Sequence, residues 1–174
     1  PYALRFMLGN DPLTEKFVGG TVYQAFLSAF SYHRWHAPVS GHVVKTVLIP
    51  GTYYSEARSA GFDPSAPNDS QGYLAEVATR ALIYIEADNP DIGLMCFIAI
   101  GMAEVSTFEI SVFQGQHIEK GQETGMFHFG GSTYCLVFGP HVNLEFDLHG
   151  QTPGLESSNI NINSRLATVG PRRK

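Results

Sequence analysis

The sequence predicts a mostly β domain of the α+β class, with a few short helices. Val, Ile, Tyr and Phe are grouped in short runs, and 18 glycines and 10 prolines are spread among them. This composition is typical of many strands joined by tight turns rather than of a helical bundle. The 174 residues suffice for one core and are too few for two ordinary domains. We therefore expect a single domain over 1–174, with a further segment of the protein upstream of it.

The elements follow from local periodicity and from turn residues. In the first half we expect helices over 2–9 and from Pro12, a strand over 21–30, a polar and aromatic turn over 32–38, a strand over 41–49 and a surface loop over 59–70. In the second half we expect a helix over 73–80, a hairpin turn over 87–91, and strands over 81–86, 93–102, 104–113, 132–138 and 142–148. Glycine-rich bends should dominate 115–131, and the segment beyond Gly150 shows only weak periodicity.

Charge and hydropathy exclude several classes of function. The formal net charge of -5 argues against nucleic-acid binding, and the one basic run lies at the C-terminal end, over 172–174. The longest apolar stretch, 92–103, is about a dozen residues long, whereas a membrane span needs about twenty. Cys96 and Cys135 lie within apolar runs, so both should be buried, reduced thiols. We expect a cytoplasmic protein that does not dock on membranes.

The candidate nucleophile is Ser132, which follows Gly130 and Gly131. A serine-hydrolase elbow needs glycine two positions before and two after the serine, and Tyr134 breaks that pattern. Another chemistry fits better, because a hydroxyl can attack the peptide carbonyl just before it when the preceding glycine lets the backbone bend. The resulting ester can eliminate to a dehydroalanine and then lose ammonia. The product is a pyruvoyl group derived from Ser132.

Two motifs support this interpretation. Residues 115–133, GQHIEKGQETGMFHFGGST, closely resemble the processing region of the phosphatidylserine decarboxylase family. Residues 32–41, YHRWHAPVSG, resemble the tyrosine, histidine and proline block of that family. With the strands between them, the resemblance spans most of 2–146. Trp35 between the histidines and the doubled glycine look most like the soluble fungal branch, which includes decarboxylases of aromatic L-amino acids such as tryptophan.

The resemblance implies a phosphatidylserine-decarboxylase-like β-rich fold and a role for each motif residue. Self-cleavage between Gly131 and Ser132 would give a β chain over 1–131 and a 43-residue α chain over 132–174, each the partner of the other. His36 would be the histidine of the self-cleavage triad, whose aspartate lies upstream of 2–9, and His33 would lie beside the substrate. The pyruvoyl cofactor would bind the amino acid as a Schiff base and act as electron sink, and no metal is expected.

The residues allow further interpretations. His128, Phe129 and Trp35 are candidates for the substrate pocket. His33 and His36 could instead be hydrogen-bonded turn residues or an i,i+3 metal pair, and other histidines (His117, His141 and His149) are expected to be surface or satisfied polar residues.

The activity and the assembly also have alternatives. The substrate could be phosphatidylserine, giving phosphatidylethanolamine, although no basic amphipathic helix is evident. The run 115–125 also resembles the turn of a biotinyl-like or lipoyl-like barrel, which allows a binding scaffold that is not processed. The protein could also form a homo-oligomer.

Overall fold

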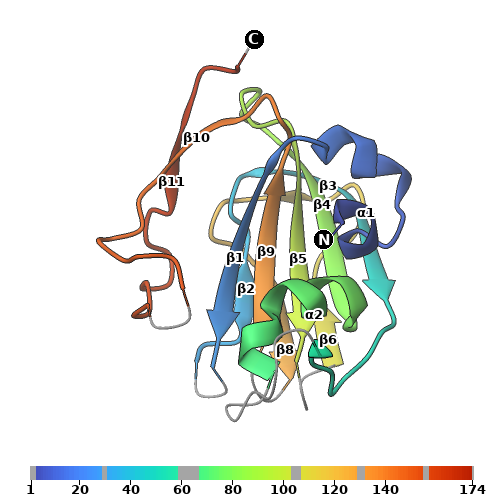
Figure 1. Cartoon of the computed structure of the whole chain (residues 1–174). Helices are drawn as coiled ribbons and strands as arrows, with labels where there is room; N and C mark the ends of the chain where they lie inside the picture. Colours follow the sequence, from blue (N-terminus) through green and yellow to red (C-terminus); the bar gives the residue numbers. More distant parts are fainter. Residues whose placement is uncertain are drawn as a thin grey trace.

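The computed structural model describes residues 3–28, 31–58, 67–102, 107–128, 132–154 and 157–173. The first half contains helix α1 (Leu4–Met7), the 3-10 helix η1 (Pro12–Phe17), strands β1 (Thr21–Leu27), β2 (Arg34–His36) and β3 (Gly41–Ile49), the 3-10 helix η3 (Pro67–Ser70) and helix α2 (Gln71–Val77). The second half contains strands β4 (Arg80–Ala87), β5 (Leu94–Gly101), β6 (Thr107–Ile110), β7 (His117–Ile118), β8 (Glu123–His128), β9 (Ser132–Phe138), β10 (Asn143–Phe146) and β11 (Ala167–Gly170). The mostly β fold with short helices is confirmed (Figure 1).

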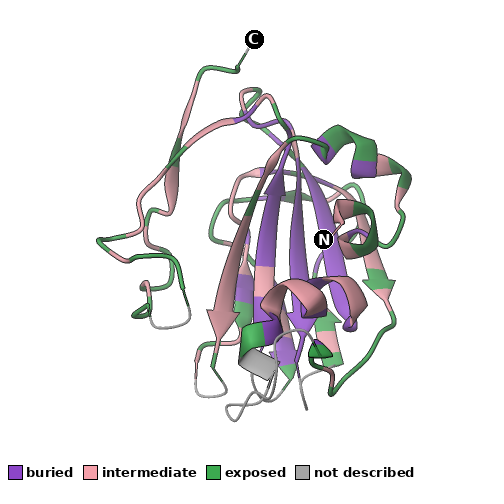
Figure 2. Ribbon diagram, viewed as in Figure 1, coloured by how far each residue is buried: buried purple, intermediate pink, exposed green. Residues whose placement is uncertain are grey.

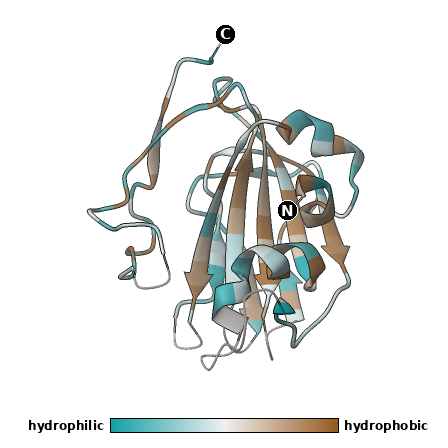
Figure 3. Cartoon of the chain, in the orientation of Figure 1, coloured by the Kyte–Doolittle hydropathy of each residue, from teal (hydrophilic) through white to brown (hydrophobic). Residues whose placement is uncertain are grey.

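Six strands form the central sheet in the order β1-β9-β5-β4-β3-β7, and all neighbouring pairs are antiparallel. Strands β9, β5 and β4 are buried along nearly their whole length, because other elements cover both faces of the sheet (Figure 2). Strands covered on both faces read as continuous apolar runs. This is why β5 is hydrophobic along most of its length and β9 becomes hydrophobic after its polar first residues (Figure 3).

A separate hydrophobic core lies on each face of the central sheet. On one face packs the three-stranded sheet β2-β8-β6, whose Trp35 shares a buried cluster with Phe97 and Leu136 of the central sheet. On the other face pack the helices, and Leu74 of α2 shares a second cluster with Ile98. Figure 1 shows α2 crossing in front of β5 and β9. The domain is thus a layer of helices, a six-stranded sheet and a smaller sheet.

Two parts of the predicted secondary structure were wrong in detail. Within the predicted turn 32–38, the residues Arg34–His36 form strand β2, which pairs with β8. Within the predicted bends of 115–131, the residues Glu123–His128 form strand β8. Gly125 lies in that strand beside Trp35, and a Cβ there would come within 2.5 Å of Trp35 Cε3. This glycine therefore marks a close approach of a side chain to the backbone rather than a bend.

The C-terminal part of the chain forms a two-stranded ribbon of β10 and β11, which projects from the sheets in Figure 1. Phe146 of the ribbon stacks on Tyr23 of β1, with 5.7 Å between the ring centroids. The prediction of a strand over 142–148 is confirmed by β10. Beyond Gly150, where the sequence shows only weak periodicity, β11 is four residues long and depends on pairing with the distant strand β10.

Two expectations drawn from composition concern the two cysteines and membrane-spanning segments. Cys96 and Cys135 are buried and unpaired, as predicted, and burial raises the pKa of the Cys135 thiol to about 12. Both thiols therefore pack as small hydrophobic groups. Within the described ranges, every helix is too short or too polar to cross a bilayer.

Candidate functional site

Ser132 is the first residue of β9, an inner strand of the central sheet. Its backbone lies in register with Leu27 of β1 on one side and with Gly101 of β5 on the other, and the residue is fully buried. The prediction of a strand over 132–138 is confirmed. Gly131, the predicted end of the β chain, lies outside the described residues, as do Phe129 and Gly130.

Strand alternation shows which way the Ser132 side chain points. Cys135 and Val137 belong to the core beneath the helices, whereas Leu136 belongs to the core between the two sheets. Because side chains two apart in a strand share a face, Ser132 points with Leu136 toward the three-stranded sheet. Its neighbour across the pair, Gly101, has no side chain to fill the space beside it. The Ser132 hydroxyl therefore faces the sheet that carries His33 and His36.

The Ser132 hydroxyl is buried without a hydrogen-bond partner among the described residues. A buried polar group left unpaired costs about 1–3 kcal/mol, and such groups are rare in folded proteins. A serine that only opened a strand would form a hydrogen bond or be replaced by alanine at little cost. The unpaired hydroxyl is therefore a candidate reactive group.

His33 lies beside the strand that leads into Ser132. Its carbonyl accepts a hydrogen bond of 3.0 Å from the Phe127 backbone N–H, and its ring meets the Phe127 ring edge-on at 6.1 Å. Phe127 precedes Ser132 by five positions, near the end of β8. The Nε2 atom of His33 is also buried without a partner among the described residues. An unpaired imidazole nitrogen can accept or donate a proton, so His33 is a second candidate reactive group.

His36 is held by two hydrogen bonds. Its Nδ1 atom lies 2.7 Å from the carbonyl oxygen of Gly121, and its Nε2 atom lies 2.8 Å from the hydroxyl of Tyr32. Because a carbonyl can only accept, Nδ1 carries the proton, and a neutral ring then accepts the Tyr32 hydroxyl at Nε2. As the triad base, His36 should lie within hydrogen-bond reach of Ser132, directly or through one water. In this structure both of its ring nitrogens bond other groups, and the Ser132 hydroxyl has no direct partner among the described residues. A contact between His36 and Ser132 would require Nε2 to release Tyr32, which is exposed.

The aromatic residues between the sheets form one connected wall. Trp35 contacts the rings of Phe127 and Phe108 at 5.0 and 6.1 Å, and these two rings lie 5.6 Å apart. On its other side Trp35 contacts Phe97 at 5.5 Å, and Phe97 in turn stacks on Tyr134. The wall runs from the face of β9 that holds Ser132 to the ring that contacts His33.

The three predicted pocket residues lie in different surroundings. Trp35 is 3% exposed within the aromatic wall, and its indole N–H has no partner among the described residues. His128 is exposed, and its Nε2 lies 3.2 Å from a carboxylate oxygen of Glu109. Phe129 is not among the described residues. The side chain of β8 that faces inward beside Trp35 is Phe127.

Sequence reasoning missed the positions of Phe108, Phe127 and Tyr32. Phe127 and Tyr32 lie within the two motifs, so the motif positions could have indicated both residues. Phe108 lies in a short strand whose inward face depends on pairing with β8, which no local pattern reveals.

The other histidines are satisfied polar residues, as predicted. His141 Nε2 lies 3.1 Å from the carbonyl oxygen of Ile92, and His149 Nε2 lies 2.8 Å from that of Arg165. His117 is exposed, and its hydrogen bond to Asp88 raises its pKa above the ordinary value. None of these contacts involves Ser132.

Comparisons with known proteins show which family the chain resembles. Residues 1–156 match the family model described as phosphatidylserine decarboxylase. The chain is 48% identical, over 97% of its length, to "Decarboxylase iboD" of Amanita muscaria, and 46% identical, over 78%, to an L-tryptophan decarboxylase of Psilocybe cubensis. It is 32% identical, over 79%, to a phosphatidylserine decarboxylase proenzyme of Anoxybacillus flavithermus. These alignments cover 50%, 33% and 47% of the three relatives, so the chain spans half of their length or less.

Proposed function

Because this chain belongs to the phosphatidylserine decarboxylase family, we propose that it is the catalytic core of a pyruvoyl-dependent decarboxylase of an aromatic L-amino acid such as tryptophan. The observation that carries the proposal is the Ser132 hydroxyl, which is buried and unpaired at the start of an inner strand. The strand begins directly after the glycine pair at which the backbone would be cut. A buried hydroxyl at that point would be the group that attacks the carbonyl just before it.

The residues around Ser132 fit a pyruvoyl group formed at this position. The methyl end of such a group is no larger than the serine side chain that it replaces, and the cross-strand neighbour Gly101 adds no side chain opposite it. Once formed, the group supplies an electrophilic carbonyl that takes up the substrate amine and accepts electrons as carbon dioxide leaves. The chain itself must supply proton transfer and a surface for the substrate side chain.

The two histidines would divide the proton transfers between them. His36 is the proposed base for self-cleavage, because its Nδ1 proton is fixed by the Gly121 carbonyl and its Nε2 atom is free to accept a proton once Tyr32 moves away. His33 is the proposed proton donor during decarboxylation, because its Nε2 atom is already unpaired beside the strand that leads to Ser132. Both assignments follow the motif positions of the family.

Cleavage before Ser132 would leave the new N-terminus held in the sheet. Both neighbours of β9, the strands β1 and β5, belong to the segment 1–131. The proposed α chain would therefore stay bound through backbone hydrogen bonds on both edges of β9. The two chains should separate only when the protein unfolds.

The aromatic substrate is supported by the relatives and by the site. Two relatives that are 46% identical to the chain are named L-tryptophan decarboxylases. The wall of Trp35, Phe108 and Phe127 adjoins His33, so an aromatic side chain would find apolar rings beside the proposed proton donor. Phosphatidylserine is the second candidate, supported by the relative named as its decarboxylase proenzyme.

The test uses the full-length protein. Intact mass should show two chains, one ending at Gly131 and one beginning with a pyruvoyl group in place of Ser132. Release of carbon dioxide is then measured with aromatic L-amino acids, aliphatic L-amino acids and phosphatidylserine vesicles. We expect activity with the aromatic group. A single uncut chain would support the unprocessed scaffold, and activity with phosphatidylserine alone would overturn the substrate assignment.

A further inference from the structure

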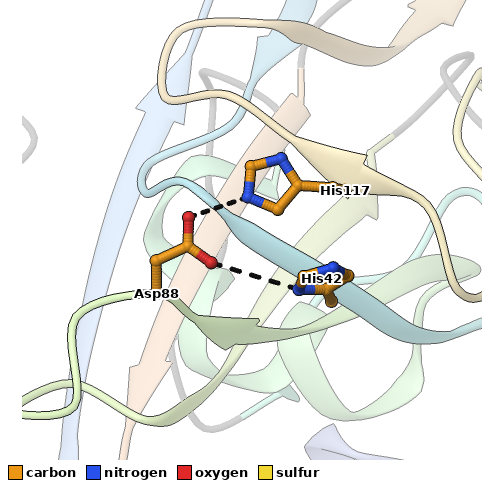
Figure 4. A group of neighbouring side chains, drawn as sticks. All are labelled: His42, Asp88 and His117. Carbon is orange, nitrogen blue, oxygen red and sulfur yellow. Dashed lines mark hydrogen bonds and ion pairs between the residues drawn. The ribbon is translucent and has the colours of Figure 1, made fainter.

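Three side chains from separate parts of the chain meet at the surface, as Figure 4 shows. They are His42 of β3, Asp88 just after β4, and His117 of β7. Asp88 Oδ2 lies 2.8 Å from His117 Nε2, and Asp88 Oδ1 lies 4.0 Å from His42 Nδ1. The two imidazole rings are 4.7 Å apart between centroids. All three residues are exposed, and one ligand atom of each lies within 4.8 Å of the others.

The backbone holds the three residues in place. His42 and His117 are direct partners in the register of β3 and β7, so their side chains share one face of the sheet. The Asp88 N–H donates a 2.9 Å hydrogen bond to the carbonyl of Ser40, which fixes the start of the β4–β5 turn against β3. The cluster therefore rests on three backbone segments that the sheet already orders.

The spacing of these atoms suits a small divalent ion. Zinc binds imidazole nitrogen and carboxylate oxygen at about 2.0–2.2 Å in a tetrahedron, which places ligand atoms roughly 3.4 Å apart. The separations of 2.8 Å from Asp88 Oδ2 to His117 and of 4.0 Å from Asp88 Oδ1 to His42 lie on either side of that value. Small side-chain rotations on the fixed backbone would therefore be enough to form the site.

A carboxylate outside the cluster supports one of the proposed ligands. Glu119 Oε1 lies 3.6 Å from His117 Nδ1, the ring nitrogen that does not face Asp88. The second carboxylate oxygen of Glu119 accepts a 3.0 Å hydrogen bond from the Ser40 hydroxyl. Histidine ligands commonly donate their other N–H to a carboxylate, which orients the ring and strengthens the ligand. Glu119 is positioned to do this when His117 binds a metal through Nε2.

We propose that His42, Asp88 and His117 bind one zinc ion, with water completing the coordination. Two imidazole ligands favour zinc and similar transition metals over magnesium or calcium, which prefer oxygen ligands. The sequence led us to expect no metal, and the one metal pair considered was His33 with His36. The cluster of His42, Asp88 and His117 was not foreseen, because it forms only when three distant segments meet. The proposal does not depend on the proposed decarboxylase activity.

The position of this zinc site in the sheet indicates a structural role. Gly101, the partner of Ser132, lies beside the Arg80 end of β4, whereas Asp88 follows the opposite end at Ala87. At about 3.3 Å per residue, the site lies roughly 25 Å along the sheet from Ser132. A zinc ion there would tie β7, which is only two residues long, and the β4–β5 turn to β3.

The competing explanation is an ordinary hydrogen bond between Asp88 and His117. Substitution of His42 distinguishes zinc binding from this hydrogen bond, because His42→Ala removes one metal ligand and leaves the 2.8 Å Asp88–His117 contact unchanged. If zinc binds, His42→Ala should weaken its affinity at least tenfold. If the cluster holds no metal, His42→Ala should leave zinc uptake unchanged.

The experiment uses the full-length protein, stripped of metal with a chelator and titrated with Zn²⁺ at pH 8, where neutral imidazoles can ligate. We expect uptake of one zinc per chain, and a rise in Tm of about 5 °C at a hundredfold excess over Kd. Titration with Co²⁺ should give the visible absorption of a tetrahedral nitrogen and oxygen site. No saturable uptake by the wild-type protein would overturn the proposal.

Matched variants locate the site. His42→Ala, Asp88→Asn and His117→Ala should each lose the zinc-dependent rise in Tm. His149→Ala removes an exposed histidine whose Nε2 bonds a backbone carbonyl, and it should retain that rise. Ser132→Ala should also retain it, which separates zinc binding from self-cleavage. Equal zinc uptake by wild-type protein and the three cluster variants would place the metal elsewhere and overturn the proposal.

Discussion

The two ends of the central sheet carry polar side chains that differ in burial and in hydrogen bonding. At one end, the Ser132 hydroxyl and His33 Nε2 are buried and unpaired among the described residues. At the other end, His42, Asp88 and His117 are exposed, and the last two share a hydrogen bond. An unpaired buried group lowers stability by about 1–3 kcal/mol, whereas an exposed bonded group carries no such cost. The difference indicates that the buried end is the one adapted to chemistry.

Replacement of the serine should have the largest effect. In the full-length protein, Ser132→Ala removes the attacking hydroxyl, so we expect one uncut chain on denaturing electrophoresis and no release of carbon dioxide. Ser157→Ala, at an exposed serine that bonds a loop carbonyl, is the control and should cut normally. Cleavage of the Ser132→Ala protein at the same position would remove this residue from the chemistry.

Replacement of the histidines should separate the two reactions at the buried end. His36→Ala removes the proposed base for cleavage and should cut slowly or not at all. His33→Ala should give two chains with the pyruvoyl group in place, yet lose about a hundredfold to ten-thousandfold in decarboxylation rate, the usual cost of removing a positioned proton-transfer group. Intact mass measures the first effect and single-turnover kinetics the second. A His33→Ala protein that works at the wild-type rate would return His33 to a structural role.

A third change tests how tightly the buried end is packed. In Gly125→Ala the new Cβ would lie 2.3 Å from the Glu109 carbonyl oxygen and 2.5 Å from Trp35 Cε3. Such overpacking costs about 1–3 kcal/mol of unfolding free energy, and thermal unfolding measures it. Gly154→Ala is the control, because its φ of 154° is close to the 158° of Gly125 and nothing lies within 4 Å of its Cβ. Equal Tm values for the two variants would contradict the packing of Trp35 on β8.

Sequence and structure agree best where local pattern and burial coincide. Strand β9 was predicted at 132–138, because its run from Tyr134 to Phe138 is apolar, as is typical of inner strands covered on both faces. Strands β2 and β8 were not recognised, because each exists through pairing with distant residues and contains a histidine or glycine that reads locally as a turn. Ser132, His33 and His36 were predicted as site residues through a motif, and Tyr32 was not predicted as the partner of His36. The meeting of His42 with Asp88 and His117 depends on strand register, which a single sequence does not reveal.

The smallest change in Tm should come from an exposed ion pair, and its size shows how little a hydrogen-bonded surface group contributes to stability. Asp147 Oδ2 accepts a 2.8 Å hydrogen bond from Arg165 Nη2, and this bond lowers the pKa of Asp147 below its ordinary value, with help from the His149 N–H. A carboxyl whose folded pKa is depressed stabilises the fold above its unfolded pKa, and that stability is lost as pH falls through the folded value. Arg165→Gln should therefore raise the Asp147 pKa toward its ordinary value, measured by NMR titration of the carboxyl carbon. Because both side chains contact solvent, the variant should shift Tm at pH 7 by less than Gly125→Ala does. An Asp147 that titrates at or above its ordinary value in the wild-type protein would show that the pair is not formed. If Arg165→Gln shifted Tm as much as Gly125→Ala does, exposed polar groups would matter as much for stability as the buried end, contrary to the difference proposed above.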